Sequence, residues 1–357
     1  MPDLVPELSW QSLTATIIDI KSPNTFLQDM LIGGRRNTHP TEQLEVGKWL
    51  GGRRMVPFVK KGAQAYPIAG VTSSFRSVEA PNIRVKIGFA PSPLLFGRQP
   101  GTQVFLQGGE TQVSAVQSHI SRDMAYMADQ ITNREEWLVA QALTGKITYS
   151  QTDDLHAEAF EFDYQRAAGH TIVLAGADLW SAGTADIAGD VDSADQLIAE
   201  AVGANVTDVI MDALAADAFL NNSKVQSIVD RNFREAGSPL QFGSRNDPST
   251  GARWLGNIFG VDWWRYNRTV LDADGTTVKM IPDKTAFFVA RSAAVAPSIE
   301  YGAIPDMDAF EGGLLQSQRF SKSWVEKDPS QVVALTHTRP FVLLRYPEFC
   351  VQMQVLA

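Results

Sequence analysis

The sequence is almost without cysteine, because Cys350 is the single one among 357 residues. One cysteine cannot form a disulfide within the chain, and Cys350 lies in an apolar strand pattern. We therefore expect a buried, unreactive thiol and an origin in a reducing, intracellular environment. No run approaches the roughly 18 apolar residues of a membrane span. The opening MPDLVPELSW lacks the basic start and apolar centre of a secretory signal, which predicts a protein that is neither exported by the usual route nor embedded in a membrane.

Recognisable catalytic and cofactor motifs are also missing. None of the five histidines falls in an arrangement typical of a metal site: His39, His119, His156, His170 and His337. The sequence has no G-x-S-x-G, no P-loop and no G-x-G-x-x-G that opens a helix after a strand. The acidic stretch at 153–158 and the DADG sequence at 272–275 are better explained as a polar loop and a hairpin turn than as cation sites. We therefore expect no catalytic residue, no metal and no cofactor.

Positive charge is scarce overall and is concentrated in one region. The net charge is −9, which argues against a protein whose main task is to grip nucleic acid. Residues 48–109 nevertheless contain nine basic residues and one acidic residue, so this region carries +8 and the rest of the chain −17. A solvated basic surface or a nucleic-acid patch would each explain the basic region alone. A basic hairpin that docks on the negative body of a neighbouring copy explains both halves of the charge distribution, and we prefer it.

Hydrophobic periodicity predicts both strands and one unusually long helix. Residues 51–91 alternate short β-favouring runs with Gly and Pro, which indicates a long hairpin-like excursion. From Ser114 an apolar stripe that includes Ile120, Ile131 and Leu138 predicts a helix of about 30 residues that ends at Gly145. Strands and two shorter helices follow, and Trp263 and Trp264 are expected on opposite faces of one strand. The chain closes on a strand in which four apolar residues alternate with other residues: Phe349, Val351, Met353 and Val355.

This order of elements resembles the Hong Kong ninety-seven capsid fold of tailed phages. The C-terminal residues resemble the end of the lambda-like major capsid family, phage major capsid protein E. The matching features are Trp324 with Val325, Asp328 with Pro329, the apolar strand 341–344 and the closing segment 347–355. The first part of the chain, TATIIDIKSPNTFLQDMLI, is also similar to the start of that family. The individual motifs are short, and their shared order along nearly the whole chain carries the resemblance.

The resemblance implies an α+β fold of five parts. These are an N-terminal arm at 1–40, an extended E-loop at 41–100, a peripheral domain with the spine helix at 101–190, an axial domain at 191–310, and C-terminal strands at 311–357 that return to the peripheral domain. Basic residues of the E-loop region are the expected inter-subunit contacts: Arg53, Arg54, Lys60, Lys61, Arg76, Arg84 and Lys86. Some proteins of this fold cross-link their subunits through Lys and Asn, but no partner for Lys60 or Lys61 can be identified by motif, so we expect a non-covalent shell.

The implied function is that of a phage major capsid protein. Hexamers and pentamers of the chain would assemble in the bacterial cytoplasm into an icosahedral head around double-stranded DNA. Portal, scaffold and decoration proteins are the expected partners, and contact with DNA would be non-specific. A bacterial nanocompartment shell of the same fold is the nearest alternative. An uncharacterised hydrolase is the alternative from a different class, and it would require a pocket with convergent polar groups.

Overall fold

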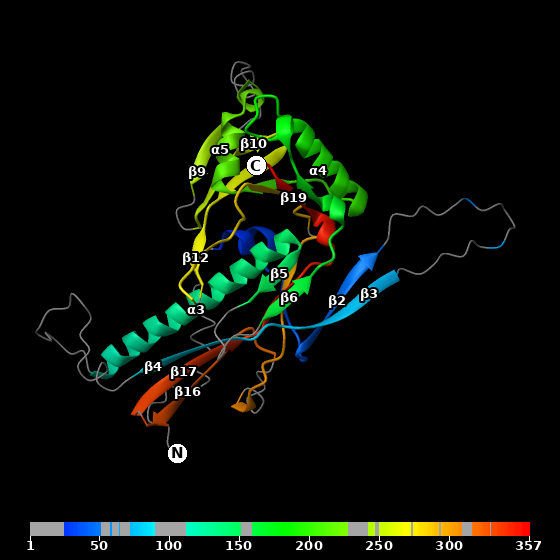
Figure 1. Ribbon diagram of the computed structural model, residues 1–357. Helices are drawn as coiled ribbons and strands as arrows, with labels where there is room; N and C mark the ends of the chain where they lie inside the picture. Colours follow the sequence, from blue (N-terminus) through cyan, green and yellow to red (C-terminus); the bar gives the residue numbers. More distant parts are fainter. Residues whose placement is uncertain are drawn as a thin grey trace, which may run out of the picture.

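The computed structural model combines one long helix, one seven-stranded sheet and several small sheets (Figure 1). The described residues are 25–50, 58, 64, 72–89, 112–150, 159–227, 242–246, 250–272, 274–292, 294–308, 316–328 and 330–357. This mixture of helix and sheet agrees with the expected α+β class. Within these ranges, no helix is both long enough and apolar enough to cross a membrane.

The predicted long helix is α3, Gln112–Thr144, which has 33 residues and is therefore about 50 Å long. It begins at Gln112, two residues before the start predicted at Ser114. The helix ends at Gly145, whose φ of 86° favours glycine. Ile131 and Leu138 are buried along α3, whereas the side chain of Ile120 lies outside the described residues.

A seven-stranded sheet forms the upper part of the molecule in Figure 1, together with helices α4 (Ile187–Ala201) and α5 (Ala213–Asn221). Its strand order is β7 (Thr171–Val173), β19 (Cys350–Gln354), β14 (Thr285–Val289), β8 (Asp208–Met211), β11 (Val261–Tyr266), β10 (Ala252–Ile258) and β9 (Phe242–Asn246). The central strands β8 and β14 are buried along their whole length.

Asp212 begins α5 by accepting hydrogen bonds from the backbone N–H groups of Leu214 and Ala215, which is the usual role of an N-cap aspartate. On β11, Trp263 is fully buried and Trp264 is partly exposed, as the strand alternation predicted.

The other sheets lie along and beyond α3. A three-stranded sheet has the order β16 (Phe320–Lys327), β17 (Ser330–Thr338) and β4 (Ile83–Phe89), and a second one has the order β1 (Arg36–Thr38), β15 (Ser298–Tyr301) and β18 (Pro340–Leu343). Three two-stranded sheets pair β2 (Gln43–Leu50) with β3 (Thr72–Glu79), β5 (Lys146–Tyr149) with β6 (Phe160–Asp163), and β12 (Thr269–Leu271) with β13 (Thr277–Lys279). Short helical turns are η2 (Gln28–Ile32), η3 (Ala168–His170), η4 (Gly176–Asp178) and η5 (Pro347–Phe349).

The final strand differs from its expected position. Strands β16 and β17 lie beside α3, but β19 pairs with β14 in the seven-stranded sheet, and β14 belongs to the segment 191–310. The sheet pairing therefore favours the segment 191–310 over the peripheral domain as the place of β19. The residues of this strand explain its position, because Phe349, Val351, Met353 and Val355 are buried and so is Cys350 on the opposite face. The opposite face also carries Gln352 and Gln354, which are partly exposed, so one face of the strand is fully buried and the other is buried only in part.

Glu136, in the C-terminal third of α3, binds the first described residues of the chain. Its carboxylate accepts hydrogen bonds from the backbone N–H groups of Leu27 (2.8 Å) and Gln28 (3.0 Å) and from the hydroxyl of Tyr266 (2.8 Å). Burial raises the pKa of the Glu136 carboxyl, and these hydrogen bonds oppose the shift. The carboxylate thus supplies acceptors to backbone donors that lie at the start of a short helical turn.

Candidate inter-subunit surface

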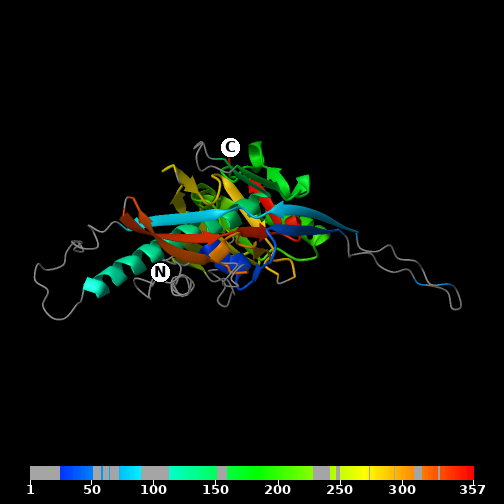
Figure 2. The same ribbon diagram turned by 90° about the horizontal axis from the view of Figure 1, so that it is seen from below.

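The most protruding feature of the described structure is the β2–β3 hairpin, which extends from the body on the side opposite to the start of α3 (Figures 1 and 2). The strands pair without interruption from Gln43 opposite Glu79 to Leu50 opposite Thr72. Near the body, Leu44, Val46 and Val78 are buried. The expected basic contacts Arg53, Arg54, Lys60 and Lys61 lie outside the described residues.

Phe58 is one of two described residues between the hairpin strands, and its side chain is fully exposed. A large apolar side chain that is exposed to water can serve as a contact with another chain. The exposure of Phe58 makes it a candidate contact that the charge pattern alone could not identify.

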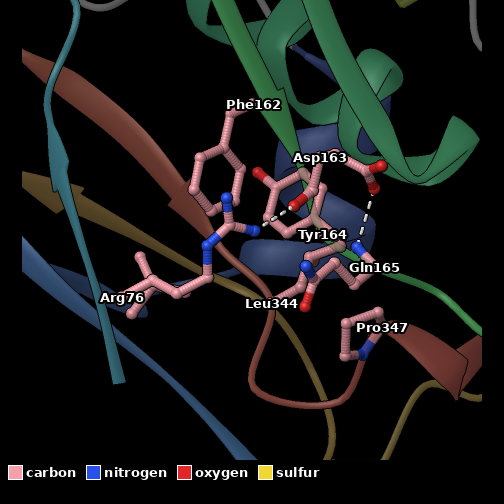
Figure 3. Close-up of a pocket in the computed structure, with 8 residues that line it drawn as sticks. Arg76, Phe162, Asp163, Tyr164, Gln165, Leu344 and Pro347 are labelled. Atoms are coloured by element: carbon pink, nitrogen blue, oxygen red, sulfur yellow. Dashed lines mark hydrogen bonds between the residues drawn. The ribbon is translucent and has the colours of Figure 1, made fainter. Parts of the chain in front are cut away.

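Arg76 is the one expected E-loop contact whose side chain the structure describes on the hairpin, and it contacts its own subunit. Its Nη1 donates a hydrogen bond to the backbone carbonyl of Asp163 (3.0 Å), and its guanidinium lies over the ring of Phe162, 5.3 Å from the centroid (Figure 3). Beneath it is a small hollow whose lining includes Tyr164, Leu344 and Pro347. Arg76 therefore ties strand β3 to the end of β6.

Arg84 and Lys86 do not belong to the hairpin. They are exposed on β4, which pairs with β17, and this pairing favours an E-loop that ends before β4 over one that ends at residue 100. The alternating sequence of β4 was recognised as a strand, but its long-range partner could not be read from the sequence. A sheet pairing between residues about 250 positions apart depends on tertiary packing and not on local pattern.

Several exposed apolar side chains lie elsewhere on the described surface. Trp324 and Val325 are exposed on β16, at an edge of its sheet, and Tyr126 is exposed on α3. The Trp-Val pair was noticed in the sequence only as part of the family-like ending. A strand edge with exposed apolar residues is a typical place for contact with another chain.

Negative charge is segregated as strongly as positive charge. Residues 167–223 contain nine acidic residues and no Lys or Arg. Some of them have structural roles, such as Asp190, which accepts a hydrogen bond from the indole N–H of Trp180 (2.8 Å), and Asp208, which is buried beside Arg291 at 3.2 Å. Five are exposed: Asp178, Asp186, Asp192, Glu200 and Asp217. This part of the molecule therefore presents an acidic surface on and around α4 and α5.

The described residues contain no cluster of metal-ligating side chains. Several of their buried ionisable groups have structural partners. Glu135, for example, pairs with Arg319 at 3.2 Å and accepts a hydrogen bond from Tyr301, also at 3.2 Å. Cys350 is a free, fully buried thiol whose pKa is raised by burial to about 12. A thiol with this pKa is neither a ready nucleophile nor a ready metal ligand near neutral pH.

The fold is that of phage capsid proteins. A crystal structure of a capsid protein assigned to a prophage of E. coli CFT073 matches with a TM-score of 0.69 and 17% identity, covering 98% of this chain and 99% of that one. A phage-related protein from Bordetella bronchiseptica RB50 matches with a TM-score of 0.50 and 10% identity, over 96% of this chain and 95% of that one.

The sequence assigns the family. The profile of the family "Phage major capsid protein E" matches residues 9–355, so the chain belongs to this family. The major capsid proteins of Escherichia phage N15 and Enterobacteria phage phi80 are each 27% identical to the chain, over 230 and 224 residues. Each alignment covers 62% of this chain and 62% of the relative, which is less than two thirds of either relative's length.

Proposed function

We propose that this chain is the major capsid protein of a tailed phage, and that its copies assemble into the closed shell of the virion. The family match over residues 9–355 carries this proposal, because it spans the hairpin, the long helix and both groups of sheets. The phage origin of the two relatives favours a virus head over a nanocompartment.

The finer form of the proposal is a head built from hexamers and pentamers around double-stranded DNA. The acidic surface of residues 167–223 is compatible with this role, because a lining that bound phosphates tightly would hinder DNA movement during packaging. Contact with DNA would then be non-specific. Portal, scaffold and possibly decoration proteins are the further partners that a growing shell of this kind would need.

The described elements support a revised division into domains. The N-terminal arm remains 1–40, but the hairpin β2–β3 limits the E-loop to about 41–80. We assign β4, α3, β16 and β17 to the peripheral domain, and the seven-stranded sheet with α4 and α5, including β19, to the axial domain.

The hairpin is proposed as the inter-subunit clamp, with its basic residues against the negative body of the next copy. An exposed ion pair contributes only about 0–1 kcal/mol, but a closed shell repeats each interface many times. Reversal of Arg53, Arg54, Lys60 and Lys61 to Glu should abolish shell formation and leave the circular dichroism of the subunit unchanged. The matched control exchanges Lys and Arg at the same four positions, which keeps the charge and should keep assembly. Wild-type assembly should weaken as salt screens the pairs.

Negative-stain microscopy of the protein produced with its genomic neighbours tests the overall function. Closed icosahedral particles, with terminase and portal genes beside the capsid gene, are the expected result. Shells filled with an enzyme encoded next to the chain would favour the nanocompartment. A protein that stays monomeric under all conditions would contradict both.

A further inference from the structure

A single buried guanidinium contacts the root of the β2–β3 hairpin, which is the place where the chain enters β2 at Glu42 and leaves β3 at Glu79 and Ala80. Arg339 lies between β17 and β18 and is 3% exposed. Its Nε and Nη2 donate to the backbone carbonyl of Ala80 (3.2 and 3.1 Å), and its Nη1 donates to the carbonyl of Ala303 (3.4 Å). Its Nη1 also lies 3.2 Å from Glu42, and its Nη2 lies 2.9 Å from Glu79. One side chain therefore contacts the body and, at the root of the hairpin, the start of β2 and the end of β3.

The shape of the guanidinium is what makes this contact possible. Arginine has five N–H donors in a rigid planar fork, whereas lysine has one ammonium on a flexible stem. A lysine at position 339 would keep the charge but could not span the same set of acceptors. The body also approaches the root closely, because a Cβ on Gly302 would lie 3.3 Å from the Cβ of Ala80 and 3.5 Å from the carbonyl oxygen of Glu42.

Arg76 provides a second point of attachment on the same strand. It lies three residues from Glu79, about 10 Å along β3, and binds the carbonyl of Asp163 and the ring of Phe162. A ribbon held at its root alone could swing about that root, whereas a ribbon held at two points has a fixed direction. The Phe162 ring is itself held edge-on against Phe341, at 5.0 Å between centroids, so the second attachment is to a packed part of the body.

We propose that Arg339 and Arg76 are positioning residues that set the direction in which the hairpin leaves the subunit. Arg339 fixes the position of the root, and Arg76 fixes the angle between the hairpin and the body. The hairpin therefore has its direction before a neighbouring copy binds. The inference rests on the proposed function in one respect, which is that the target of the hairpin is a second copy of this chain.

The direction can be measured in the unassembled subunit by the distance between two spin labels. The labels would be attached to Ser74→Cys on β3 and Ser193→Cys on α4. Cys350 should remain unlabelled because it is fully buried and burial raises its pKa. Position 74 lies about 17 Å from Glu79 along the strand, so each 10° of swing moves the label by about 3 Å. Wild type should give one narrow distance distribution. Arg76→Ala and Arg339→Lys should each broaden or shift the distance distribution by several times this displacement of about 3 Å. Arg76→Lys should give a narrower distribution than Arg76→Ala, because the lysine keeps a cation near the Phe162 ring.

Arg84→Ala is the matched control, because Arg84 is an exposed arginine on neighbouring β4 and should leave the distance unchanged. Each variant is also tested for shell assembly, where Arg76→Ala should lower the yield of closed particles. A wild-type distance distribution in both Arg76→Ala and Arg339→Lys would overturn the proposal, as would normal shells from a variant with a clearly broadened distribution. If wild type itself formed no shell, the proposed function would fail while the distance measurement would still report on the two arginines. If Arg339→Lys did not fold, Arg76→Ala would decide.

Discussion

His337 should make the subunit less stable in mild acid. The residue lies on β17 with 1% of its surface exposed, and neither ring nitrogen has a hydrogen-bond partner among the described residues. Burial lowers the pKa of His337 to about 4, and the positive charges of Arg84, Arg339 and Lys322 act in the same direction, while the negative charge of Asp306 opposes them. The imidazole is therefore neutral in the folded subunit at neutral pH.

The direction of the pH dependence follows from the lowered pKa. In the unfolded chain His337 takes up a proton near its ordinary pKa of 6.5, whereas in the folded subunit it does so only near 4. Between these values the unfolded state binds more protons, so stability is full above about pH 6.5 and falls as the pH decreases toward 4. A shift of about 2.5 units corresponds to about 3 kcal/mol in total, of which about 2 kcal/mol would be lost by pH 5.

The assay is urea unfolding of the unassembled subunit at several pH values between 5 and 8. His337→Leu removes the titrating group without the loss of a hydrogen bond. Between pH 8 and pH 5 the free energy of unfolding of the variant should therefore fall by about 2 kcal/mol less than that of wild type. His39→Gln is the control, because it removes a histidine that is partly exposed beside Glu300 and should leave most of the dependence in place. Equal pH profiles for wild type and His337→Leu would refute the assignment of the lowered pKa to His337.

Two further predictions concern burial. Leu138→Asp should destabilise the subunit by about 4 kcal/mol or more, because an unpaired charge would enter the buried side of α3. Soluble yield and urea unfolding measure the loss, and Gln130→Asp on the exposed side of the helix is the control. Equal soluble yields of the two variants would contradict the burial of Leu138. Cys350 should react with thiol reagents only after denaturation and should form no disulfide-linked dimer on non-reducing gels of assembled particles; rapid labelling of the native protein would contradict its burial and raised pKa.

Local pattern predicted the elements of this fold well, and long-range pairing poorly. The stripe through Ile131 and Leu138 indicated α3, because helical periodicity depends only on the spacing of residues close together in the sequence. The alternation in β4 indicated a strand for the same reason. The partner of β4 was not predictable, since an exposed basic residue such as Arg84 fits a free hairpin and a sheet edge equally well. The pairing of β19 with β14 was not predictable for the same reason, because the alternation along the final strand does not show which sheet it joins.

The candidate surface was predicted only as a concentration of charge. The sequence indicated that basic residues cluster in residues 48–109, but it could not show that Arg76 contacts its own subunit. The role of Arg339 was invisible, because it lies about 260 residues from Glu79 in the sequence and has no local motif. Contacts of this kind depend on which backbone carbonyls the fold brings together, and those are known only once the sheets are assembled.

The hairpin itself gives the strongest physical reason to expect a neighbour. A two-stranded ribbon is only marginally stable alone in water, and the structure describes no third strand beside β2 and β3. The subunit nevertheless fixes its root with a guanidinium that contacts three backbone or carboxylate groups of the hairpin, and places an exposed Phe58 beyond it. A rigid root contributes nothing to a ribbon that ends in solvent, but it lowers the entropy lost when the ribbon docks on another surface. The fixed root and the exposed Phe58 are thus both explained if the surface that covers the hairpin belongs to the next copy in the shell.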